Sequence, residues 1–370
     1  MFPKYQIYVL NWAGQIVKFY DGAAFYSLKY SRELNSIGSI ALALPTFPGI
    51  GSIFKLDHFI EVQRTSPKTG KLLTEETYFV RMVNMYQDGD EERFIVGGQS
   101  LNHLIGRRVV DPDDDPLQAG GYSTKAGAAD QLMHDYATDQ MSSLASVSRR
   151  FPNFFVGGAA PIGKPVGQRL RHENLLKIFE ALAAQGQVDF YIKRLIGNTL
   201  ELQFGILGVD MTRSYNYPFT PSVILTPRRG NLTNPSLKLD RTSEENFVYI
   251  KGQGQGDKRL VYKLPSDTIF DSPYNRNEFA EDGRSSTKSN ALELYTQGKS
   301  ALTTKRKVKQ FTFNPGPDEP GNTYRFDWDL GDYLTIIWDD FELNFRVIGI
   351  EISVNAGGED IKVTMGQPNV

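Results

Sequence analysis

The sequence of 370 residues contains no cysteine. Without thiols, the chain has no disulfide bonds, cysteine nucleophiles, iron–sulfur clusters or cysteine-ligated zinc. It also has no run of about 18 uncharged apolar residues, the length that a membrane helix needs. The first segment, Met1–Leu10, lacks the basic region and the cleavage site of a signal peptide. We therefore expect a protein that is soluble or carried within an assembly.

Neither sign of charge is in clear excess. Lysine and arginine total 41, aspartate and glutamate total 43, and the net charge is −2. A dedicated binder of duplex nucleic acid normally carries a basic excess, so this balance argues against that class and equally against an acidic disordered tail. Hydrophobic residues make up 40% and charged residues 23%, as is typical of a folded protein. At about 150 residues per domain, the length predicts two to three domains.

The first hundred residues predict β structure, because short aromatic and β-branched runs alternate with turn residues. The predicted strands are Gln6–Leu10, Ile16–Tyr20, Phe25–Tyr30, Ser39–Leu44, Phe59–Arg64, Tyr78–Tyr86 and Arg93–Val96. This spacing is typical of a barrel or a sandwich, with a turn at Asp88–Asp90. Asp111–Ala119 is rich in proline and charge, and we place a domain boundary there.

The middle of the chain mixes helices and strands, and the last third returns to strands. Apolar periodicity predicts helices at Ala126–Leu144 and Arg171–Gln185, separated by an ordered loop at Phe151–Pro165. Strands at Val188–Arg194 and Thr199–Phe204 complete an α+β middle part. The remaining predicted elements are a helix at Ser289–Thr303, a loop at Pro315–Gly321, and a meander of Tyr333–Trp338, Phe345–Ser353 and Ile361–Met365.

A faint internal repeat links the two ends of the chain. The matching pairs of segments are Ser27–Arg32 with Ser236–Arg241, Leu56–Ile60 with Leu330–Leu334, and Tyr78–Met85 with Phe345–Ile352. The first two landmarks lie 24 residues apart in the first copy and 89 in the second. The repeat therefore predicts two related β-barrels, the second interrupted by an insertion of about 65 residues.

Histidines and acidic clusters give no strong sign of a metal site. The four histidines, His58, His103, His134 and His172, lie in different elements and without metal-ligand spacing. Asp111, Asp113 and Asp115 alternate as at the start of a calcium loop, but Pro116 and Tyr122 occupy positions where that loop needs glycine and glutamate. We interpret the segment as a solvated acidic loop, with a weak calcium site as the alternative.

Catalytic motifs are also incomplete. Gly252–Gly256 (GQGQG) is followed by a strand pattern instead of a helix, which favours a hairpin loop or β-bulge over a phosphate cradle. The acid pairs Asp327/Asp329 and Asp339/Asp340 could serve a glycosidase, but both occur where structural reasons suffice. We predict no catalytic, cofactor-binding or metal-binding residue and no cofactor.

The strongest basic run is Lys305-Arg306-Lys307-Val308-Lys309. On a strand, the three lysines would share one face and Arg306 and Val308 the other. A solvated strand that protects a sheet edge is the simpler interpretation. The alternative is a polar wall that meets nucleic acid or an acidic partner.

Three stretches in a fixed order along the chain carry a resemblance. They are Tyr26–Arg32 continuing through Asn35, Gly38 and Leu42–Pro45; Ser100–Val110 before an Asp-rich loop and a helix; and Asp327–Leu334 leading into Arg346–Ile352 and Met365-Gly366. Over most of its length the chain thereby resembles the baseplate-hub, or tail-tip hub, proteins of tailed phages. None of these stretches is a catalytic signature, so the resemblance rests on their order.

The resemblance implies a mainly β protein with α+β parts and two tail-tube-like barrels. We expect a first barrel over residues 1–110, an α+β middle domain over 111–222, and a second barrel over 223–370 with an inserted segment near 242–306. Three chains would form a ring at the virion's tail tip that adapts a sixfold tail tube to a threefold tip and surrounds the exit channel for DNA. The implied partners are the tail tube or distal tail protein, the tape-measure protein, and fibre or tip proteins.

Some relatives continue into peptidase, lysozyme-like or receptor-binding modules. Because this chain stops at Val370, we expect such activities in other chains.

Two further functional hypotheses stay open. The generous aromatic content and the acid pairs support a cell-wall hydrolase or glycan-binding tail protein, which would place Trp12, Trp328 or Trp338 on the surface beside paired acids. A contractile injection particle, instead of a virus, would use the same hub.

Overall fold

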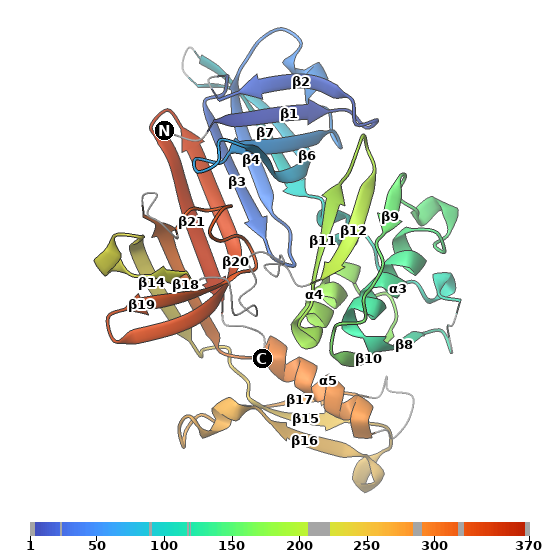
Figure 1. Cartoon of the computed structure of the whole chain (residues 1–370). Coiled ribbons are helices and arrows are strands. Elements are labelled where there is room, and N and C mark those ends of the chain that lie inside the picture. The colour runs from blue at the N-terminus through green and yellow to red at the C-terminus, as the bar shows by residue number, and fades with distance from the viewer. Residues whose placement is uncertain are drawn as a thin grey trace.

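In the computed structural model, the described residues are 4–22, 24–88, 91–116, 118, 120–205, 223–283, 291–316 and 322–366. A thirteen-stranded sheet dominates the described part (Figure 1). Its strands are β1 (Tyr5–Leu10), β2 (Ile16–Asp21), β3 (Ser27–Glu33), β4 (Ser39–Pro45), β5 (Phe59–Thr65), β6 (Leu72–Asp88), β7 (Glu91–Ser100), β13 (Ile224–Leu225), β14 (Leu232–Asp240), β18 (Val308–Pro315), β19 (Tyr333–Trp338), β20 (Phe341–Asn355) and β21 (Gly358–Gly366). The prediction of a mainly β protein with α+β parts is confirmed.

One strand order occurs twice in this sheet. The first copy runs β3-β4-β7-β6-β5, and the second runs β14-β18-β21-β20-β19, with antiparallel pairing throughout. We call these strand sets the first and the second repeat. The matching segments Ser27–Arg32 and Ser236–Arg241 fall on β3 and at β14, which are equivalent strands.

The two repeats belong to one sheet and not to two separate barrels. β20 is long enough to pair with β19 along its first half and with β3 along its second half. The sheet therefore continues from one repeat into the other, and its path ends at β2 and β14. Among the described strands no closed barrel is found, which differs from the two barrels that the sequence predicts.

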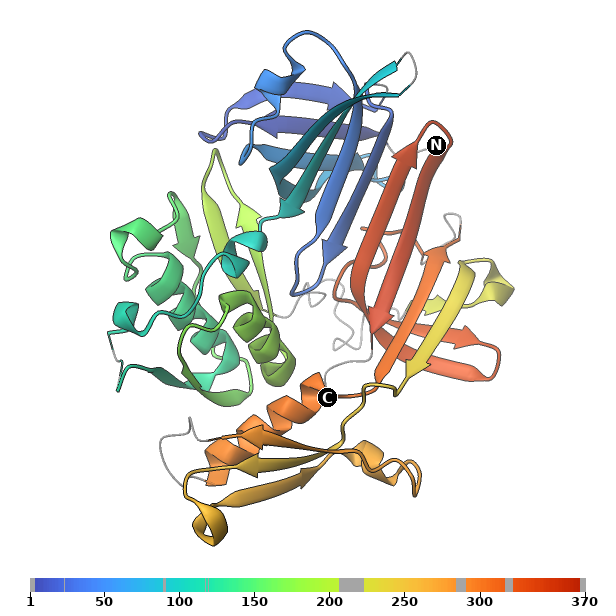
Figure 2. The same ribbon diagram turned by 180° about the vertical axis from the view of Figure 1, so that it is seen from behind.

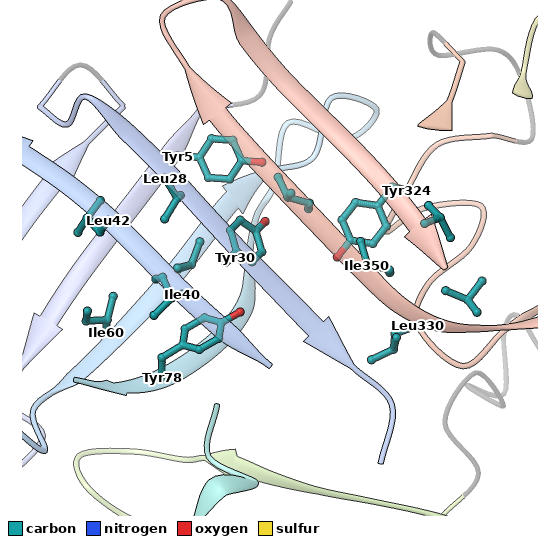
Figure 3. Close-up of a cluster of buried hydrophobic side chains, with 14 of the residues drawn as sticks. Tyr5, Leu28, Tyr30, Ile40, Leu42, Ile60, Tyr78, Tyr324, Leu330 and Ile350 are labelled. Atoms are coloured by element: carbon teal, nitrogen blue, oxygen red, sulfur yellow. The ribbon is translucent and has the colours of Figure 1, made fainter. Parts of the chain in front are cut away.

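Alternating residues give this sheet one apolar face. The hydrophobic core on this apolar face includes Leu28, Leu42 and Val96 from the first repeat. It also includes Phe311 and Ile350 from the second repeat, and all five side chains are buried. Because side chains alternate across a strand, the residues between them point to the opposite face. A single apolar core thus spans both repeats, as Figure 3 shows for the region where the strands of the two repeats meet.

The middle part packs against the first repeat. Its elements are β8 (Ser123–Ala128), α3 (Ala129–Met141), β9 (Phe154–Val156), β10 (Pro165–Leu170), α4 (Leu175–Gly186), β11 (Asp189–Arg194) and β12 (Leu200–Gly205). The first predicted helix begins at Ala129, three residues late, because Ala126–Ala128 pair with Pro165–Gly167 in a two-stranded sheet. The predicted loop before Pro165 contains β9, which pairs in parallel with β12.

The connection between β14 and β18 contains a small α+β unit. Its elements are β15 (Phe247–Lys251), β16 (Val261–Pro265), β17 (Glu278–Asp282) and α5 (Ala291–Thr304). Val248, Ile250, Leu294 and Leu302 form a separate core there. Figure 2 shows α5 between this sheet and α4, and Gln185 Nε2 donates to Ser300 Oγ at 2.6 Å across that contact.

Short helices complete the described chain. They are α1 (Ile50–Ile53), α2 (His103–Gly106), and the 3-10 turns Pro112–Asp114, Val147–Arg149, Pro227–Arg229, Gly256–Lys258 and Asp267–Phe270. None of the described helices is long and apolar enough to cross a membrane. Gly89 and Asp90 of the predicted turn, and residues 317–321 of the predicted loop, lie outside the described residues.

Candidate functional site

The junction between β3 and β20 joins the two repeats. Seven residue pairs connect the strands, from Gly349 opposite Glu33 to Asn355 opposite Ser27. On the apolar face, Ile352 lies opposite Tyr30, and neither side chain is more than 1% exposed. The junction is therefore as well buried as the interior of either repeat.

A buried ion pair crosses the junction on the apolar face. Arg64 of β5 donates from Nε and Nη2 to the two carboxylate oxygens of Glu359, at 2.8 and 2.7 Å. The Tyr5 hydroxyl donates to the same carboxylate. The Arg64 side chain is only 3% exposed and that of Glu359 10%. Two-point binding of this kind fixes the orientation of both groups and thus of β21 against β1 and β5.

A second charged group forms beside it, around Asp329. Arg32 of β3 donates to Asp329 Oδ1 at 2.6 Å, and Arg325 donates to Asp329 Oδ2 at 2.6 Å. Burial alone would raise the pKa of Asp329, but the two guanidinium groups outweigh it and hold that pKa below its usual value. Asp329 is therefore an ionised partner of two arginines.

Tyr324 links this group to the first repeat. Its hydroxyl donates to Glu75 Oε2 at 2.6 Å and accepts from Arg32 at 2.7 Å. Burial raises the pKa of Tyr324 well above its usual value, so the hydroxyl stays protonated and acts as a donor. In Figure 3, Tyr324, which lies between β18 and β19 in the chain, is beside Tyr30 and Tyr5, where the two repeats meet.

The middle part is fixed to both repeats at Asp189. This carboxylate, 1% exposed, accepts from Asn35 Nδ2 at 2.7 Å and forms an ion pair with Arg346 of β20. Asn35 follows β3, and Asp189 is the first residue of β11. One buried residue thus holds three parts of the chain in a fixed arrangement.

A cavity of about 640 Å³ lies where these three parts meet. Among its lining residues are Glu61, Glu75, Arg194, Arg325 and Asp329. Arg194 pairs with Glu61 and Arg325 with Asp329, so these cations are neutralised by neighbouring anions. The cavity has the chemistry of an interdomain joint, in which these two arginines pair with neighbouring carboxylates.

The opposite face of the sheet is polar and follows both repeats. Most of its side chains are small or charged, and most are partly or fully exposed. They include Ser27, Lys29, Ala41, Ser236, Lys238, Glu351, Ser353, Lys362 and Thr364. Lys29 pairs with Glu351 at 3.0 Å and Lys238 with Asp240 at 3.1 Å, so each of these two lysines has a neighbouring carboxylate.

Glu33 lies at the edge of this polar face. Burial, together with the nearby Glu351, raises the pKa of Glu33 from 4.5 to about 7. The junction therefore has a carboxyl group that takes up a proton near neutral pH.

The histidines lie apart from one another. His58 is buried, with Nδ1 2.9 Å from the Ile53 carbonyl, and His134 lies 3.1 Å from Asp135. Burial, followed by repulsion from Arg81 and Arg107, lowers the pKa of His103. His172 is exposed. Within the described ranges, no group of three or more His, Asp or Glu side chains could hold a metal ion.

The predicted acidic loop is only partly solvated. Asp113 is exposed, and Asp111 accepts from its backbone N–H as the cap of a 3-10 turn. Asp115, in contrast, is 2% exposed and pairs with Lys125 at 3.3 Å. The prediction of a solvated acidic loop is wrong for Asp115, because Lys125 of β8 forms ion pairs with both Asp115 and Asp139 in a buried cluster.

The predicted glycine loop and basic run both have structural roles. Gly252–Gly256 connects the antiparallel strands β15 and β16, which confirms the hairpin interpretation. The basic run is not a strand throughout, because α5 extends to Thr304 and β18 begins only at Val308. Lys305 pairs with Glu245, and Lys307 with Asp271 at 2.8 Å. These lysines therefore anchor the inserted unit to its own acidic residues.

The tryptophans do not form a common surface. Trp328 is fully buried, and Trp338 packs against Phe311 at 5.9 Å between ring centroids. Trp12 is 61% exposed, but it lies on the β1–β2 turn, far along the chain from the acid pairs. Burial thus removes Trp328 as a glycan-stacking residue.

The candidate acid pairs are used in different ways. Asp329 is the partner of Arg32 and Arg325, whereas Asp327 caps the turn by accepting from the Thr323 backbone N–H at 2.8 Å. Asp339 and Asp340 form the turn between β19 and β20, and Asp339 has a positive φ of 53°. The sequence pattern did not reveal the partners of Asp329, because Arg32 is 297 residues away.

Solved structures with a similar fold include tail proteins. The 43 kDa tail protein of prophage MuSo2 from Shewanella oneidensis is 14% identical, with a TM-score of 0.61 and 99% coverage of both chains. A tail protein from Neisseria meningitidis MC58 is also 14% identical, with a TM-score of 0.59 and coverage of 98% of this chain and 96% of that one. The Francisella PdpA–VgrG complex contains a chain with 8% identity and a TM-score of 0.52, over 98% of this chain and 57% of that one.

The amino-acid sequence itself was also compared with curated proteins and with models of protein families. No curated protein matches. The family model described as Siphovirus ReqiPepy6 Gp37-like protein matches residues 7–367, almost the whole chain. This match shows that the chain belongs to the Siphovirus ReqiPepy6 Gp37-like family.

Proposed function

We propose that this chain is a structural hub protein of the tail tip or baseplate. Three copies would form a ring that adapts the sixfold tail tube to a threefold tip. The observation that carries the proposal is the strand order that occurs twice within one continuous sheet. Because each chain supplies two equivalent β units, three chains supply six, the number that a sixfold tube presents.

The polar face of the sheet supports a position around the exit channel for DNA. A channel wall must let the phosphate backbone pass without holding it, since cations that bind phosphate slow its release. The charges on this face include Lys29 and Lys238, each paired with a neighbouring carboxylate. A wall of small and mutually neutralised side chains meets that requirement.

The proposed domains follow the repeats. Residues 1–110 would form the first tube-like unit, residues 111–222 the middle domain, and residues 223–370 the second unit with an insertion near 242–306. The proposed partners are further copies of the chain, the tail tube or distal tail protein, the tape-measure protein, and fibre or tip proteins. The role is structural, and catalysis is left to other chains.

The mass of the purified protein in solution tests this function. Three copies of the 41.6 kDa chain give a particle of about 125 kDa. Light scattering coupled to size-exclusion chromatography is expected to give that mass at micromolar concentration. A particle of about 42 kDa over the same range would contradict the hub proposal.

A further inference from the structure

A lysine of the middle part lies between two buried carboxylates. Lys125 Nζ is 2.7 Å from Asp139 Oδ2 and 3.3 Å from Asp115 Oδ1. The side chains of Lys125, Asp115 and Asp139 are 9%, 0% and 4% exposed. Asp115 follows the 3-10 turn Pro112–Asp114, Lys125 lies in β8 and Asp139 in α3, so three separate elements bring these groups together. We call the three residues the lysine triad.

The lysine triad lies next to the hydrophobic core of the middle part. The Lys125 Nζ atom is 5.4 Å from the centroid of the Tyr136 ring, which has no exposed surface. In α3, Asp139 stands between the fully buried residues Ala137 and Met141. A buried ion pair loses the hydration of both charges, so it has less advantage over a neutral amine beside a carboxylic acid than it would have in water. The neutral pair is the reactive one, because only an unprotonated amine is a nucleophile.

The charges of the lysine triad favour acid–base chemistry. Burial raises the pKa of Asp139 and so favours its carboxylic acid. Burial alone would lower the pKa of Lys125, but the carboxylates of Asp139 and Asp115 outweigh it and raise that pKa. The amine therefore needs a nearby base to lose its proton. Ser123 Oγ donates to Asp115 Oδ2, and this contact orients Asp115 with its Oδ1 atom toward Lys125 Nζ.

We propose that Lys125 and Asp139 form an intramolecular isopeptide bond, with Asp115 as the acid–base group. Transfer of one proton from the ammonium to Asp139 gives an amine and a carboxylic acid. The Nζ lone pair then attacks Cγ of Asp139, while Asp115 takes a proton from Nζ and passes it to a hydroxyl of the tetrahedral intermediate. The C–O bond breaks, one water leaves, and Asp115 is again a carboxylate. One C–N bond replaces one C–O bond, and no other reactant is needed.

The geometry suits this reaction. Because Nζ lies 2.7 Å from Asp139 Oδ2, the Cγ atom of the same carboxyl is at most one C–O bond further away. Groups that are held in contact react as if they were at very high concentration, and a site closed to solvent protects the product from hydrolysis. The bond would join β8 to α3 and close residues 126–138 into a loop, which restricts the unfolded chain as a disulfide does. It goes beyond the hub function and does not depend on the ring.

The mass of the intact, denatured chain tests the bond. We expect the mass of the sequence less one water. Lys125→Arg keeps the positive charge, but its guanidinium stays protonated and cannot attack, so this variant should have the full mass of its sequence. Lys193→Arg is the matched control, since Lys193 is an exposed lysine of β11, and it should still lack one water. A native chain with the full mass of its sequence would overturn the proposal.

Proteolysis distinguishes the bond from a succinimide, which also forms from aspartate with loss of water. Trypsin does not cleave after a lysine whose Nζ is acylated, so residues 109–149 should be recovered as one peptide that lacks one water. Chymotrypsin cleaves after Tyr136, and only the bond would then keep the peptides of Lys125 and Asp139 together. A succinimide leaves cleavage at Lys125 unchanged. Recovery of the two tryptic peptides as separate species would overturn the proposal.

Two further variants test the roles of the carboxyl groups. Asp139→Asn should react with release of ammonia instead of water, so the variant and the native chain should end with the same mass and the same linked peptide. Loss of one water from Asp139→Asn would place the bond at Asp115 and overturn the assignment. In Asp115→Ala the linked fraction should fall at least about tenfold, because a positioned acid–base group accelerates such a step by about 100-fold or more. Unchanged linking in Asp115→Ala, at equal circular dichroism, would overturn the role of Asp115.

Discussion

Glu359 is the residue whose removal tests the junction between the repeats most sharply. Its carboxylate accepts two hydrogen bonds from Arg64 and one from Tyr5, and both charged side chains are at least 90% buried. Glu359→Ala leaves the guanidinium group buried without its counter-ion. Breaking a buried ion pair from one side typically costs about 3–5 kcal/mol. We expect a loss of that size in the free energy of unfolding.

The triple variant Tyr5→Phe, Arg64→Met, Glu359→Leu provides the complementary test. It removes every polar member of the group and replaces them with apolar side chains, a change that is often close to neutral in a buried site. We therefore expect the triple variant to be more stable than Glu359→Ala alone. Glu351→Ala is the matched control, because Glu351 pairs with Lys29 on the exposed face and should cost less than about 1 kcal/mol.

Urea unfolding followed by both circular dichroism and tryptophan fluorescence measures these changes. The buried Trp328 reports on the second repeat, while circular dichroism reports on the whole chain. We expect Glu359→Ala to shift both signals together, since one core spans the repeats. A loss below about 1 kcal/mol, or a shift in the fluorescence signal alone, would refute the reasoning that the buried pair joins the two repeats.

Three other substitutions test further features. The pKa of Glu33, about 7 against 4.5, means that stability rises as pH falls from 8 to 5; Glu33→Gln should abolish most of that change, about 1–2 kcal/mol given its partial exposure, in urea titrations at both pH values. Trp328→Ala empties a fully buried site and should cost about 3–5 kcal/mol in thermal unfolding; a loss below about 1 kcal/mol would contradict that burial. Gly98→Ala places a Cβ 2.5 Å from the Phe79 carbonyl, so it should destabilise more than Gly97→Ala, where the nearest atom belongs to a flexible side chain; equal unfolding midpoints would contradict this packing.

Local sequence patterns were sufficient to predict most of the strands. The strand Tyr333–Trp338 was predicted with the bounds that the structure has, because it alternates between turn signals on both sides. The helix predicted at Ser289–Thr303 corresponds to α5, Ala291–Thr304. Such elements depend on neighbouring residues, which the sequence presents directly.

The continuous sheet could not be predicted in this way. In each β unit, apolar and polar residues alternate along the strands as they would in a closed barrel. This alternation does not reveal which strand edge pairs with β3. The decisive feature is the length of β20, which runs from Phe341 to Asn355 and exceeds the predicted Phe345–Ser353 by six residues. Only the pairing of its second half with a strand more than 300 residues earlier in the chain joins the two repeats.

The partners of the charged groups at the junction could not be predicted from the sequence either. Asp329 was considered as a catalytic acid because Asp327 lies two residues before it. In the structure, Asp329 instead forms ion pairs with Arg32 and Arg325. Glu359 had no distinguishing pattern at all, and its partners Arg64 and Tyr5 lie 295 and 354 residues away. Partners at that separation are chosen by the fold, so sequence spacing carries no signal for them.

The proposed hub function requires that three copies, each with two repeats, build a ring of six β units. Electron-microscopy class averages of the purified protein would show such a ring. We expect particles with threefold symmetry, six similar lobes and an open centre. A single compact particle with two lobes and no central opening, at micromolar concentration, would contradict it.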